Sequence, residues 1–215
     1  MAPSAWSDAR GVLDAGIETM DSNVSLKARS QLIRYLETLT TWNATYNLTA
    51  IREPRAMVVR HILDCVAVLP LLSGRTLADI GSGAGLPGLV VAIARPKIQV
   101  TLIESSRKKA AFLRHAKREL GLTNVHIVPR RIEQWHADTT FDIITARAFA
   151  QAAECVSAAE HLLAAGGEFM LMKGVNPSDE LSELPPAWRI MENRPVSIPG
   201  LDGERHVVRL SRGLL

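Results

Sequence analysis

The stretch from residue 76 to residue 88 constrains the fold most strongly, because an apolar run passes directly into closely spaced glycines. The run predicts a buried strand over about residues 76–80. Four residues without a Cβ atom follow it: Gly81, Gly83, Gly85 and Gly88. Their backbone can turn sharply, approach a ligand closely and begin a helix whose N–H groups point at that ligand. The stretch therefore predicts a ligand site of nucleotide size at the end of a strand.

An acid further along the chain supports this interpretation. Glu104 ends the next apolar run, Val100 to Glu104. In nucleotide-binding α/β folds, an acid at the end of the second strand binds the hydroxyls of a ribose. The alternative is a loop whose glycines serve only close strand–helix packing. The order of strand, glycine loop, helix, second strand and acid favours the nucleotide site.

Composition sets the class of protein. The 215 residues, 47% hydrophobic and 22% charged, fit one sizeable domain with an appendage. Cys65 and Cys155 do not match a disulfide framework, so we expect a reducing, cytoplasmic location. Neither the cysteines nor the histidines have the spacing of metal ligands, so we expect no metal. Without a long apolar run or a signal-peptide pattern, we expect neither secretion nor a membrane span. The net charge of +3 is compatible with a nucleic-acid partner but does not require one.

The chain divides into two regions near residue 72. Residues 1–72 predict a helical cap, because apolar residues recur at helical spacing and no glycine-rich turn interrupts them. Within the cap, residues 42–50 are prone to form turns, and Pro54 begins a further helix that runs to about residue 70. Residues 73–215 predict a compact α/β core.

Short strands alternate with helices in this core, which is typical of βαβ units and a parallel sheet. The predicted strands cover about residues 76–80, 98–103, 125–129, 141–146, 168–172, 188–198 and 206–211. The predicted helices cover about residues 89–94, 105–120, 151–164 and 178–184. The last two strands can pair as a hairpin, which gives a mostly parallel sheet with an antiparallel last strand.

Two cofactors compete for the glycine loop. Residues 83–88 alone satisfy the dinucleotide pattern G-x-G-x-x-G, so an NAD(P)-dependent oxidoreductase is one alternative. S-adenosylmethionine is the other alternative, and Asp79, two residues before the first glycine, favours it. The Asp79 carboxylate suits the cationic amino-acid end of this cofactor and would repel a pyrophosphate. With Asp79 included, the pattern resembles motif I of the class I S-adenosylmethionine-dependent methyltransferases.

Two sequence features that the chain lacks limit which atom of a base could accept the methyl group. Residues 145–149 do not carry the Asp/Asn-Pro-Pro-aromatic pattern of adenine amino methylation. Neither cysteine is expected beside that segment, where methylation of a pyrimidine at carbon five needs a nucleophile. Arg147, at the end of the fourth strand, suits a carboxylate, a phosphate or a guanine edge. Methylation of guanine N7 needs no general base, because the neutral base has a free lone pair there, so catalysis would be mostly positioning.

Several motifs together resemble the RsmG family, also called glucose-inhibited division protein B. The matching segments are Trp42-Asn43, Tyr46 to Thr49, Arg60 to Asp64, Asp79 to Gly88, Arg131 to Glu133, Arg147 to Phe149, Lys173-Gly174 and Leu201 to His206. The resemblance implies a class I, Rossmann-like methyltransferase sheet with an N-terminal helical cap. It also implies a cytoplasmic bacterial enzyme that methylates N7 of guanine 527 in 16S ribosomal RNA. S-adenosyl-L-methionine would be consumed and S-adenosyl-L-homocysteine released.

The resemblance also suggests roles for individual residues. Cofactor-binding positions are expected at Asp79, Gly81, Gly83, Gly85, Leu86, Glu104, Ile132, Glu133 and Arg147. Among these, the glycine loop would hold the methionine portion, Glu104 the ribose, and Ile132 with Glu133 the adenine edge. Arg147 and Lys173 are the candidate catalytic residues, since Lys173 ends the fifth strand and strand ends face the ligand crevice.

The RNA partner, as free ribosomal RNA or an assembling particle, would meet clustered polar and cationic residues. The candidates are Asn47, Arg60, His61, Lys173 and Arg205. Arg60 precedes Asp64 by one helical turn, so a plain ion pair between them is the alternative for that residue. Trp42, Tyr46 and Phe149 can stack on a base or pack in the core. A methyltransferase-like scaffold that binds RNA without catalysis is a third functional interpretation.

Overall fold

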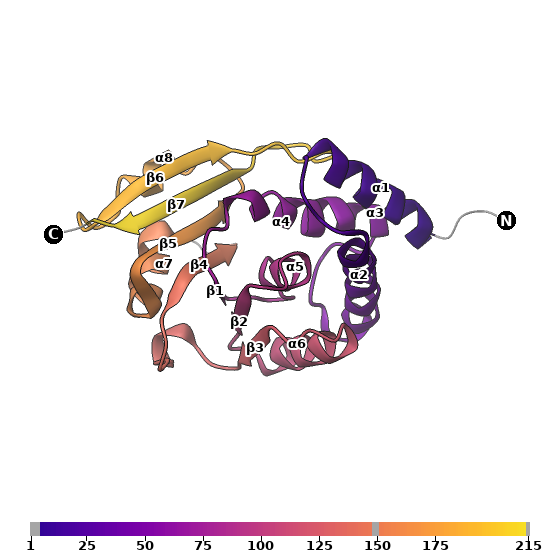
Figure 1. Ribbon diagram of the computed structural model, residues 1–215, viewed down its shortest axis with the longest axis horizontal. Coiled ribbons are helices and arrows are strands. Elements are labelled where there is room, and N and C mark those ends of the chain that lie inside the picture. Colours follow the sequence, from indigo (N-terminus) through magenta and orange to yellow (C-terminus); the bar gives the residue numbers. More distant parts are fainter. Residues whose placement is uncertain (1–4, 148–150, 214–215) are drawn as a thin grey trace.

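The computed structural model describes residues 5–147 and 151–213, and Figure 1 shows a sheet flanked by helices, with cap helices at one end. The strands are β1 (Thr76–Ile80), β2 (Gln99–Ile103), β3 (Val125–Val128), β4 (Phe141–Arg147), β5 (Leu163–Lys173), β6 (Trp188–Pro195) and β7 (His206–Arg212). The α-helices are α1 (Ala5–Thr19), α2 (Leu26–Tyr46), α3 (Pro54–Met57), α4 (Asp64–Val66), α5 (Gly88–Ala94), α6 (Arg107–Glu119), α7 (Ala152–Ala159) and α8 (Ser178–Leu181). A π-helical turn spans Val58–Leu63, and 3₁₀ turns span Leu69–Leu71, Ile132–Gln134 and Glu160–Leu162.

The seven strands form one sheet in the order β3-β2-β1-β4-β5-β7-β6. Strands β1 to β5 are parallel to one another, and β7 pairs antiparallel with both β5 and β6. The prediction of a mostly parallel sheet with an antiparallel last strand is therefore confirmed. The chain changes direction across the sheet between β1 and β4, and ligands of such sheets bind outside the carboxyl ends of the strands at this point.

Side chains of the strands alternate between two faces. Leu77 and Ile143 belong to one buried cluster, which α5, α6 and the cap cover. Ala78 and Ile144, one residue further along each strand, belong to a second cluster that α7 covers. Because both faces are covered, the central strands read as almost continuous apolar runs.

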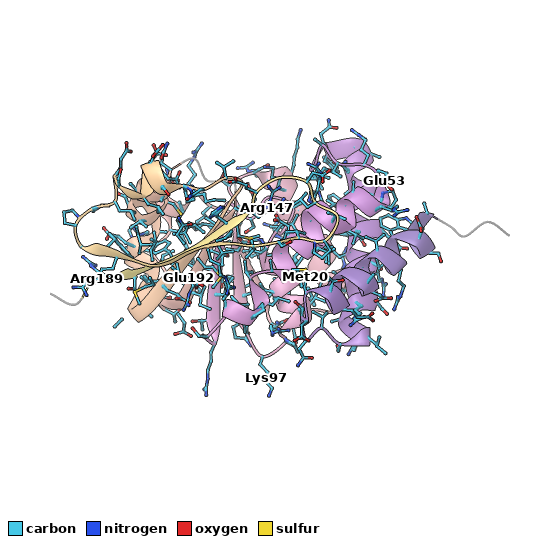
Figure 2. All side chains as sticks on the ribbon, turned by 90° about the horizontal axis from the view of Figure 1, so that it is seen from above. Met20, Glu53, Lys97, Arg147, Arg189 and Glu192 are labelled. Carbon is cyan, nitrogen blue, oxygen red and sulfur yellow. The ribbon has the colours of Figure 1, made fainter. Side chains whose placement is uncertain are left out.

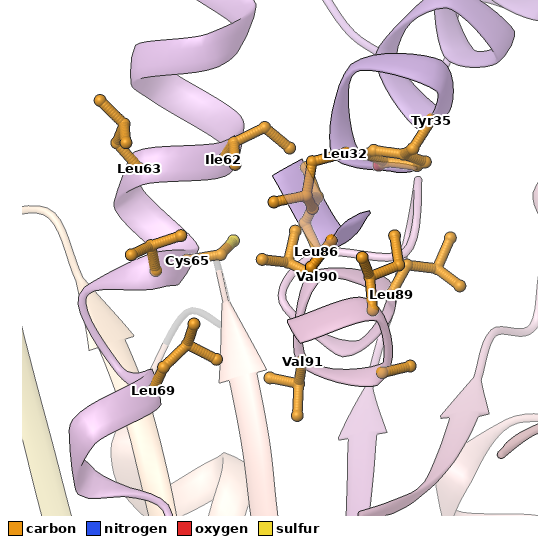
Figure 3. Close-up of a cluster of buried hydrophobic side chains, with 14 of the residues drawn as sticks. Leu32, Tyr35, Ile62, Leu63, Cys65, Leu69, Leu86, Leu89, Val90 and Val91 are labelled. Atoms are coloured by element: carbon orange, nitrogen blue, oxygen red, sulfur yellow. The ribbon is translucent and has the colours of Figure 1, made fainter. Parts of the chain in front are cut away.

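The cap and the sheet share one hydrophobic core. Figure 3 shows Leu32 and Tyr35 of α2 facing Leu86, which lies within the glycine loop, and Leu89, which follows it. The loop between β6 and β7 also reaches the cap, since Ile198 is buried in the same cluster. The boundary at residue 72 stays a prediction, while the packing joins both regions in one continuous cluster.

Several predicted segments differ from the structure. Helix α2 continues to Tyr46, through the first half of the turn-prone segment, and ends at Asn47, whose backbone is left-handed with φ 49°. The helix that begins at Pro54 contains the π-helical turn instead of running regularly. Helix α7 ends at Ala159, and β5 begins at Leu163 because that residue pairs with Phe141 next to an irregularity in β4.

None of the helices in the described ranges is both long and apolar enough to cross a membrane.

Candidate functional site

The glycine loop lies at the carboxyl end of β1, where three of its glycines have positive φ angles: Gly81 (65°), Gly83 (58°) and Gly85 (93°). L-residues with a side chain rarely adopt this conformation. A Cβ atom on Gly81 would meet nothing within 4 Å, so its α-carbon faces open space. A Cβ atom on Gly88 would instead lie 2.3 Å from Leu102 Cδ2, so Gly88 is required for close packing under the loop.

Asp79 fixes the helix that follows the loop. Its Oδ2 accepts a 2.9 Å hydrogen bond from the backbone N–H of Gly88, and its Oδ1 accepts one of 3.3 Å from the Thr145 hydroxyl. The side chain is fully buried, and burial raises the pKa of Asp79 to about 7 in spite of these hydrogen bonds. Asp79 therefore lies beneath the loop, where it orients the first residue of α5.

Glu104 is held by two backbone N–H groups. Its Oε2 accepts a 2.9 Å hydrogen bond from Gly83, and its Oε1 accepts one of 2.8 Å from Ser106. The carboxylate is buried and links the glycine loop to the start of α6. Since both oxygens are oriented by backbone, the acid has one fixed position beside the loop.

A small cavity of about 150 Å³ opens beside Gly81. It is lined by Gly81, Ile103, Ser105, Arg130, Arg131, Ile132 and Glu133. The structure thus brings Gly81 next to the pair Ile132 and Glu133, although they are far apart in sequence. Glu104 lies between two of the lining residues in the chain. The two arginines of the wall were not among the predicted cofactor positions.

A second cavity, of about 370 Å³, lies at the ends of β4 and β5. Its wall includes three predicted residues, Arg147, Lys173 and Arg205, together with Asp64 and Glu180. The Lys173 ammonium lies 2.7 Å from the Glu180 carboxylate of α8. Figure 2 shows Arg147 between the sheet and the cap helices. The sheet topology therefore gathers cations from three separate segments at one edge of the sheet.

Arg147 is partly buried and contacts the cap through its guanidinium. Its Nη2 donates a 3.0 Å hydrogen bond to the Arg60 carbonyl, and its Nη1 lies 3.9 Å from the Cys65 sulfur. Burial opposes the charge of Arg147, but the Cys65 and Asp64 groups outweigh it and raise the pKa of Arg147. The guanidinium is therefore charged and fixed.

Asp64 pairs with Arg147 and Arg205 rather than with Arg60. The Nε–Oδ distances are 3.5 Å to Arg147 and 3.1 Å to Arg205. The π-helical turn over residues 58–63 widens the helix before Asp64, so the spacing of a regular turn no longer places Arg60 beside it. The alternative of an Arg60–Asp64 ion pair is therefore wrong, and Arg60 is exposed.

The remaining RNA candidates lie away from this cavity. His61 is buried, its Nε2 lies 2.9 Å from the Thr49 hydroxyl, and burial lowers its pKa to about 4. His61 is therefore a neutral internal residue at pH 7, not a surface cation. Asn47 is exposed and accepts a 3.3 Å hydrogen bond from Arg52. Trp42 packs against Phe112 of α6, and Phe149 lies outside the described residues.

The expectation that neither cysteine lies near the fourth strand is wrong for Cys65. Its sulfur is the one that contacts Arg147, because the cap helix crosses the end of β4. Burial raises the pKa of Cys65 to about 12, so the thiol is protonated and a poor nucleophile at neutral pH. Methylation of a pyrimidine at carbon five, which needs a cysteine nucleophile, is therefore disfavoured by the protonated state of Cys65 and not by its distance from the fourth strand.

Two residues that contribute to these sites are not among the residues predicted from the sequence. The sequence pattern predicts Asp64 only as a partner of Arg60, although its place in a motif with Arg60 and His61 is a usable signal. Tyr35 is absent from the predicted site. It lies on the apolar face of α2 and donates a 2.8 Å hydrogen bond to the Ala84 carbonyl of the glycine loop. A tyrosine on a buried helix face needs a partner for its hydroxyl, which is the signal that could have found it.

Comparisons with known proteins agree with this geometry. Residues 28–208 match the model of the family described as GidB, rRNA small subunit methyltransferase G. The ribosomal RNA small subunit methyltransferase G of Xanthomonas euvesicatoria pv. vesicatoria (strain 85-10) is 44% identical over 206 residues, 96% of each chain. The protein of the same name from Stenotrophomonas maltophilia (strain K279a) is 47% identical over 199 residues, 93% of each chain.

Solved structures give the same fold at low identity. TrmN from Thermus thermophilus has a TM-score of 0.56 at 21% identity, over 72% of this chain and 53% of that one. A ribosomal protein L11 methylase from Lactobacillus delbrueckii subsp. bulgaricus has a TM-score of 0.52 at 16% identity, over 70% of this chain and 76% of that one. These likenesses show a class I methyltransferase sheet.

Proposed function

Because this chain belongs to the rRNA small subunit methyltransferase G family, we propose that it transfers a methyl group from S-adenosylmethionine to N7 of guanine 527 in 16S ribosomal RNA. The single observation that carries the proposal is the pair of adjoining sites at the carboxyl edge of the sheet. One is a small cavity beside the glycine loop, and the other is a cationic cavity at the ends of β4 and β5. The protein would act in the cytoplasm, where the ribosomal substrate is.

The residues of the small cavity fit S-adenosylmethionine. Gly81 leaves open space where a side chain would block a ligand, and Ile132 offers an apolar surface with Glu133 beside it. Glu104, fixed by Gly83 and Ser106, would accept hydrogen bonds from the ribose hydroxyls. When bound, the cofactor supplies a methyl group on a positively charged sulfur. The chain's own contribution is to hold that group in one orientation.

The residues of the larger cavity fit a guanosine and its phosphates. Arginine guanidiniums recognise phosphate and the O6 edge of guanine, and lysine binds phosphate as a point charge. Arg147 would lie at the junction of cofactor and guanine, with Lys173 and Arg205 on the RNA side. No residue is needed to remove a proton, since N7 carries none in neutral guanine. The acceptor side would therefore act by positioning and charge.

Methyl transfer from labelled S-adenosylmethionine tests the proposal directly. We expect label in small-subunit ribosomal RNA, and after nuclease digestion the labelled nucleoside should co-migrate with N7-methylguanosine. Parallel reactions with small-subunit particles and with deproteinised RNA identify the substrate form. Particles that carry adenine at position 527 serve as the matched control and should accept no label. Label that persists in the adenine control would contradict the assignment of the position.

The alternatives predict different results in the same protein sample. An NAD(P)-dependent oxidoreductase would bind NADH with measurable fluorescence change and would not bind S-adenosylmethionine. A non-catalytic scaffold would bind ribosomal particles but leave them unlabelled at saturating cofactor. Family membership and the cationic cavity favour methyl transfer over both.

A further inference from the structure

We propose that Asp64 is a positioning residue for methyl transfer, which orients Arg147 and Arg205 and balances their charge where the guanine becomes cationic. The inference rests on the proposed function and gives a role in it to a residue that lies outside the lining of the small cavity and outside the glycine loop. Asp64 lies in the wall of the larger cavity, on the cap, between Arg147 of β4 and Arg205 of the β6–β7 loop.

One carboxylate is shared by the two guanidiniums. Asp64 Oδ2 lies 3.5 Å from Arg147 Nε, and Asp64 Oδ1 accepts a 3.1 Å hydrogen bond from Arg205 Nε. The Asp64 side chain is 5% exposed, whereas those of Arg147 and Arg205 are 24% and 26% exposed. The carboxylate is therefore buried behind its two partners, whose side chains are partly exposed in the cavity wall.

Three separate segments build this arrangement. The π-helical turn Val58–Leu63 presents the Arg60 carbonyl, which accepts the 3.0 Å hydrogen bond from Arg147 Nη2. Asp64 follows that turn directly, so the same segment holds Arg147 at two points. Arg205 comes from the loop between β6 and β7, which the burial of Ile198 fixes against the cap. Such wide turns are rare in helices and often lie at functional sites.

The charge balance follows from the reaction. The guanine N7 lone pair forms a bond to the methyl carbon while the carbon–sulfur bond breaks and its electron pair stays on sulfur. Sulfur becomes neutral, and the purine ring gains one positive charge with no proton released. Arg147, Lys173 and Arg205 would repel that charge if they were unpaired. Asp64 and Glu180 place two carboxylates in the same cavity wall, each next to these cations.

Charge balance and mere structural support predict different behaviour for Asp64→Asn. The variant keeps the shape of the side chain and raises the net charge of the cavity wall by one. We expect small-subunit particles to bind as tightly as to the native chain or more tightly, with a steeper salt dependence. We expect the single-turnover rate at saturating particles and cofactor to fall by about 100-fold. Cofactor affinity should not change.

Glu204→Gln is the matched control. Glu204 precedes Arg205, and its side chain is 66% exposed. It contacts Arg205 through its backbone carbonyl, so Glu204→Gln changes the net charge by the same one unit and leaves that contact in place. The control should show the binding change alone, with a rate within about twofold of the native chain. If Asp64→Asn lowers the melting temperature strongly, Asp64→Glu carries the test, because it keeps the charge.

The outcomes separate this inference from the proposed function. If the native chain labels no particles, the proposed function fails, and the role of Asp64 with it. If native chain and Asp64→Asn transfer methyl groups at equal single-turnover rates, only the role of Asp64 is overturned. A folded Asp64→Glu variant that is also about 100-fold slower than the native chain would overturn the charge-balancing role, since the carboxylate would be present without effect.

Discussion

The Tyr35 hydroxyl of α2 donates a 2.8 Å hydrogen bond to the Ala84 carbonyl of the glycine loop, and the tyrosine is fully buried. This bond joins the cap to the segment that is expected to bind the cofactor. Desolvation by burial raises the pKa of Tyr35 well above its usual value, so the hydroxyl keeps its proton and stays a donor. The cap therefore acts as a support for the loop.

Tyr35→Phe should weaken cofactor binding and stability together. The substitution leaves the Ala84 carbonyl without its partner in a buried position, which costs about 1–3 kcal/mol. Calorimetric titration with S-adenosylmethionine and urea unfolding measure the two effects. Tyr46→Phe, on an exposed ring of the same helix, is the control and should change neither. Native cofactor affinity in Tyr35→Phe would show that the loop does not depend on the cap.

Glu104→Gln should weaken S-adenosylmethionine binding by roughly 10- to 100-fold, as expected for loss of hydrogen bonds to a charged group. The amide can replace only one of the oxygens that accept from Gly83 and Ser106. Isothermal titration checks the affinity. Glu183→Gln, on the surface, should bind the cofactor normally. Equal affinity of both variants would remove Glu104 from the ribose site.

Arg147→Ala should abolish methyl transfer while the protein still unfolds cooperatively. The cation lies in the cavity wall and its removal leaves Asp64 with Arg205 as its remaining partner. Label incorporation into small-subunit particles reports activity, and thermal unfolding followed by circular dichroism reports the fold. Arg107→Ala, on the exposed start of α6, provides the comparison. Full activity of Arg147→Ala would sink the catalytic assignment.

Gly88→Ala should destabilise the protein by about 1–3 kcal/mol, as overpacking does. The added Cβ would lie 2.3 Å from Leu102 Cδ2 and 2.7 Å from Asp79 Oδ2, so strand β2 or the loop must shift. Gly11→Ala is the matched substitution, because a Cβ on Gly11 of α1 meets nothing within 4 Å. That control should stabilise the helix by about 0.5–1 kcal/mol. Urea denaturation distinguishes the two, and equal midpoints would contradict the packing argument.

Asp79 should make stability depend on pH. Its pKa is raised from 3.8 to about 7 in the folded protein, so the folded state binds the proton more tightly than the unfolded state. The contribution of the protonated Asp79 side chain to the free energy of unfolding is full below about pH 4 and is lost as the pH rises through about 7. The loss is at most about 4 kcal/mol, at about 1.4 kcal/mol for each pH unit.

Asp79→Asn tests this prediction, because the amide has no charge to bury. The free energy of unfolding of the variant minus that of the native chain should increase from pH 5 to pH 8. Groups that titrate equally in both proteins cancel in this difference. A difference that stays constant over the range would show that Asp79 is not the titrating group.

The sequence predicted the architecture because the relevant signals are local. The apolar run into Gly81, Gly83 and Gly85 requires a strand followed by positive φ angles, and the structure has both. Serine and glycine at the ends of α6 set the limits of that helix, with Ser106 as its N-cap. Each of these features depends on residues within a few positions of one another, so periodicity and turn chemistry suffice to predict them.

The helix α7 and the turn-prone segment after residue 42 were less predictable. Strand β5 begins at Leu163 because Phe141 offers it a partner across the sheet, which overrides the helical pattern of residues 160–164. Likewise α2 extends to Tyr46 because Trp42 packs on Phe112 of α6. Long-range pairing and burial decided both limits, and neither is visible in a local window.

By itself, the sequence determined the parallel sheet, the glycine loop, the acid inside the first strand and the acid after the second strand, since each is specified by neighbours in the chain. Only the tertiary structure decided that Asp64 serves Arg147 and Arg205, and that Tyr35 supports Ala84. These pairs join residues 49 to 141 positions apart. The π-helical turn and the path of the β6–β7 loop bring them together, and the free energy for that arrangement comes from burying the cap against the sheet.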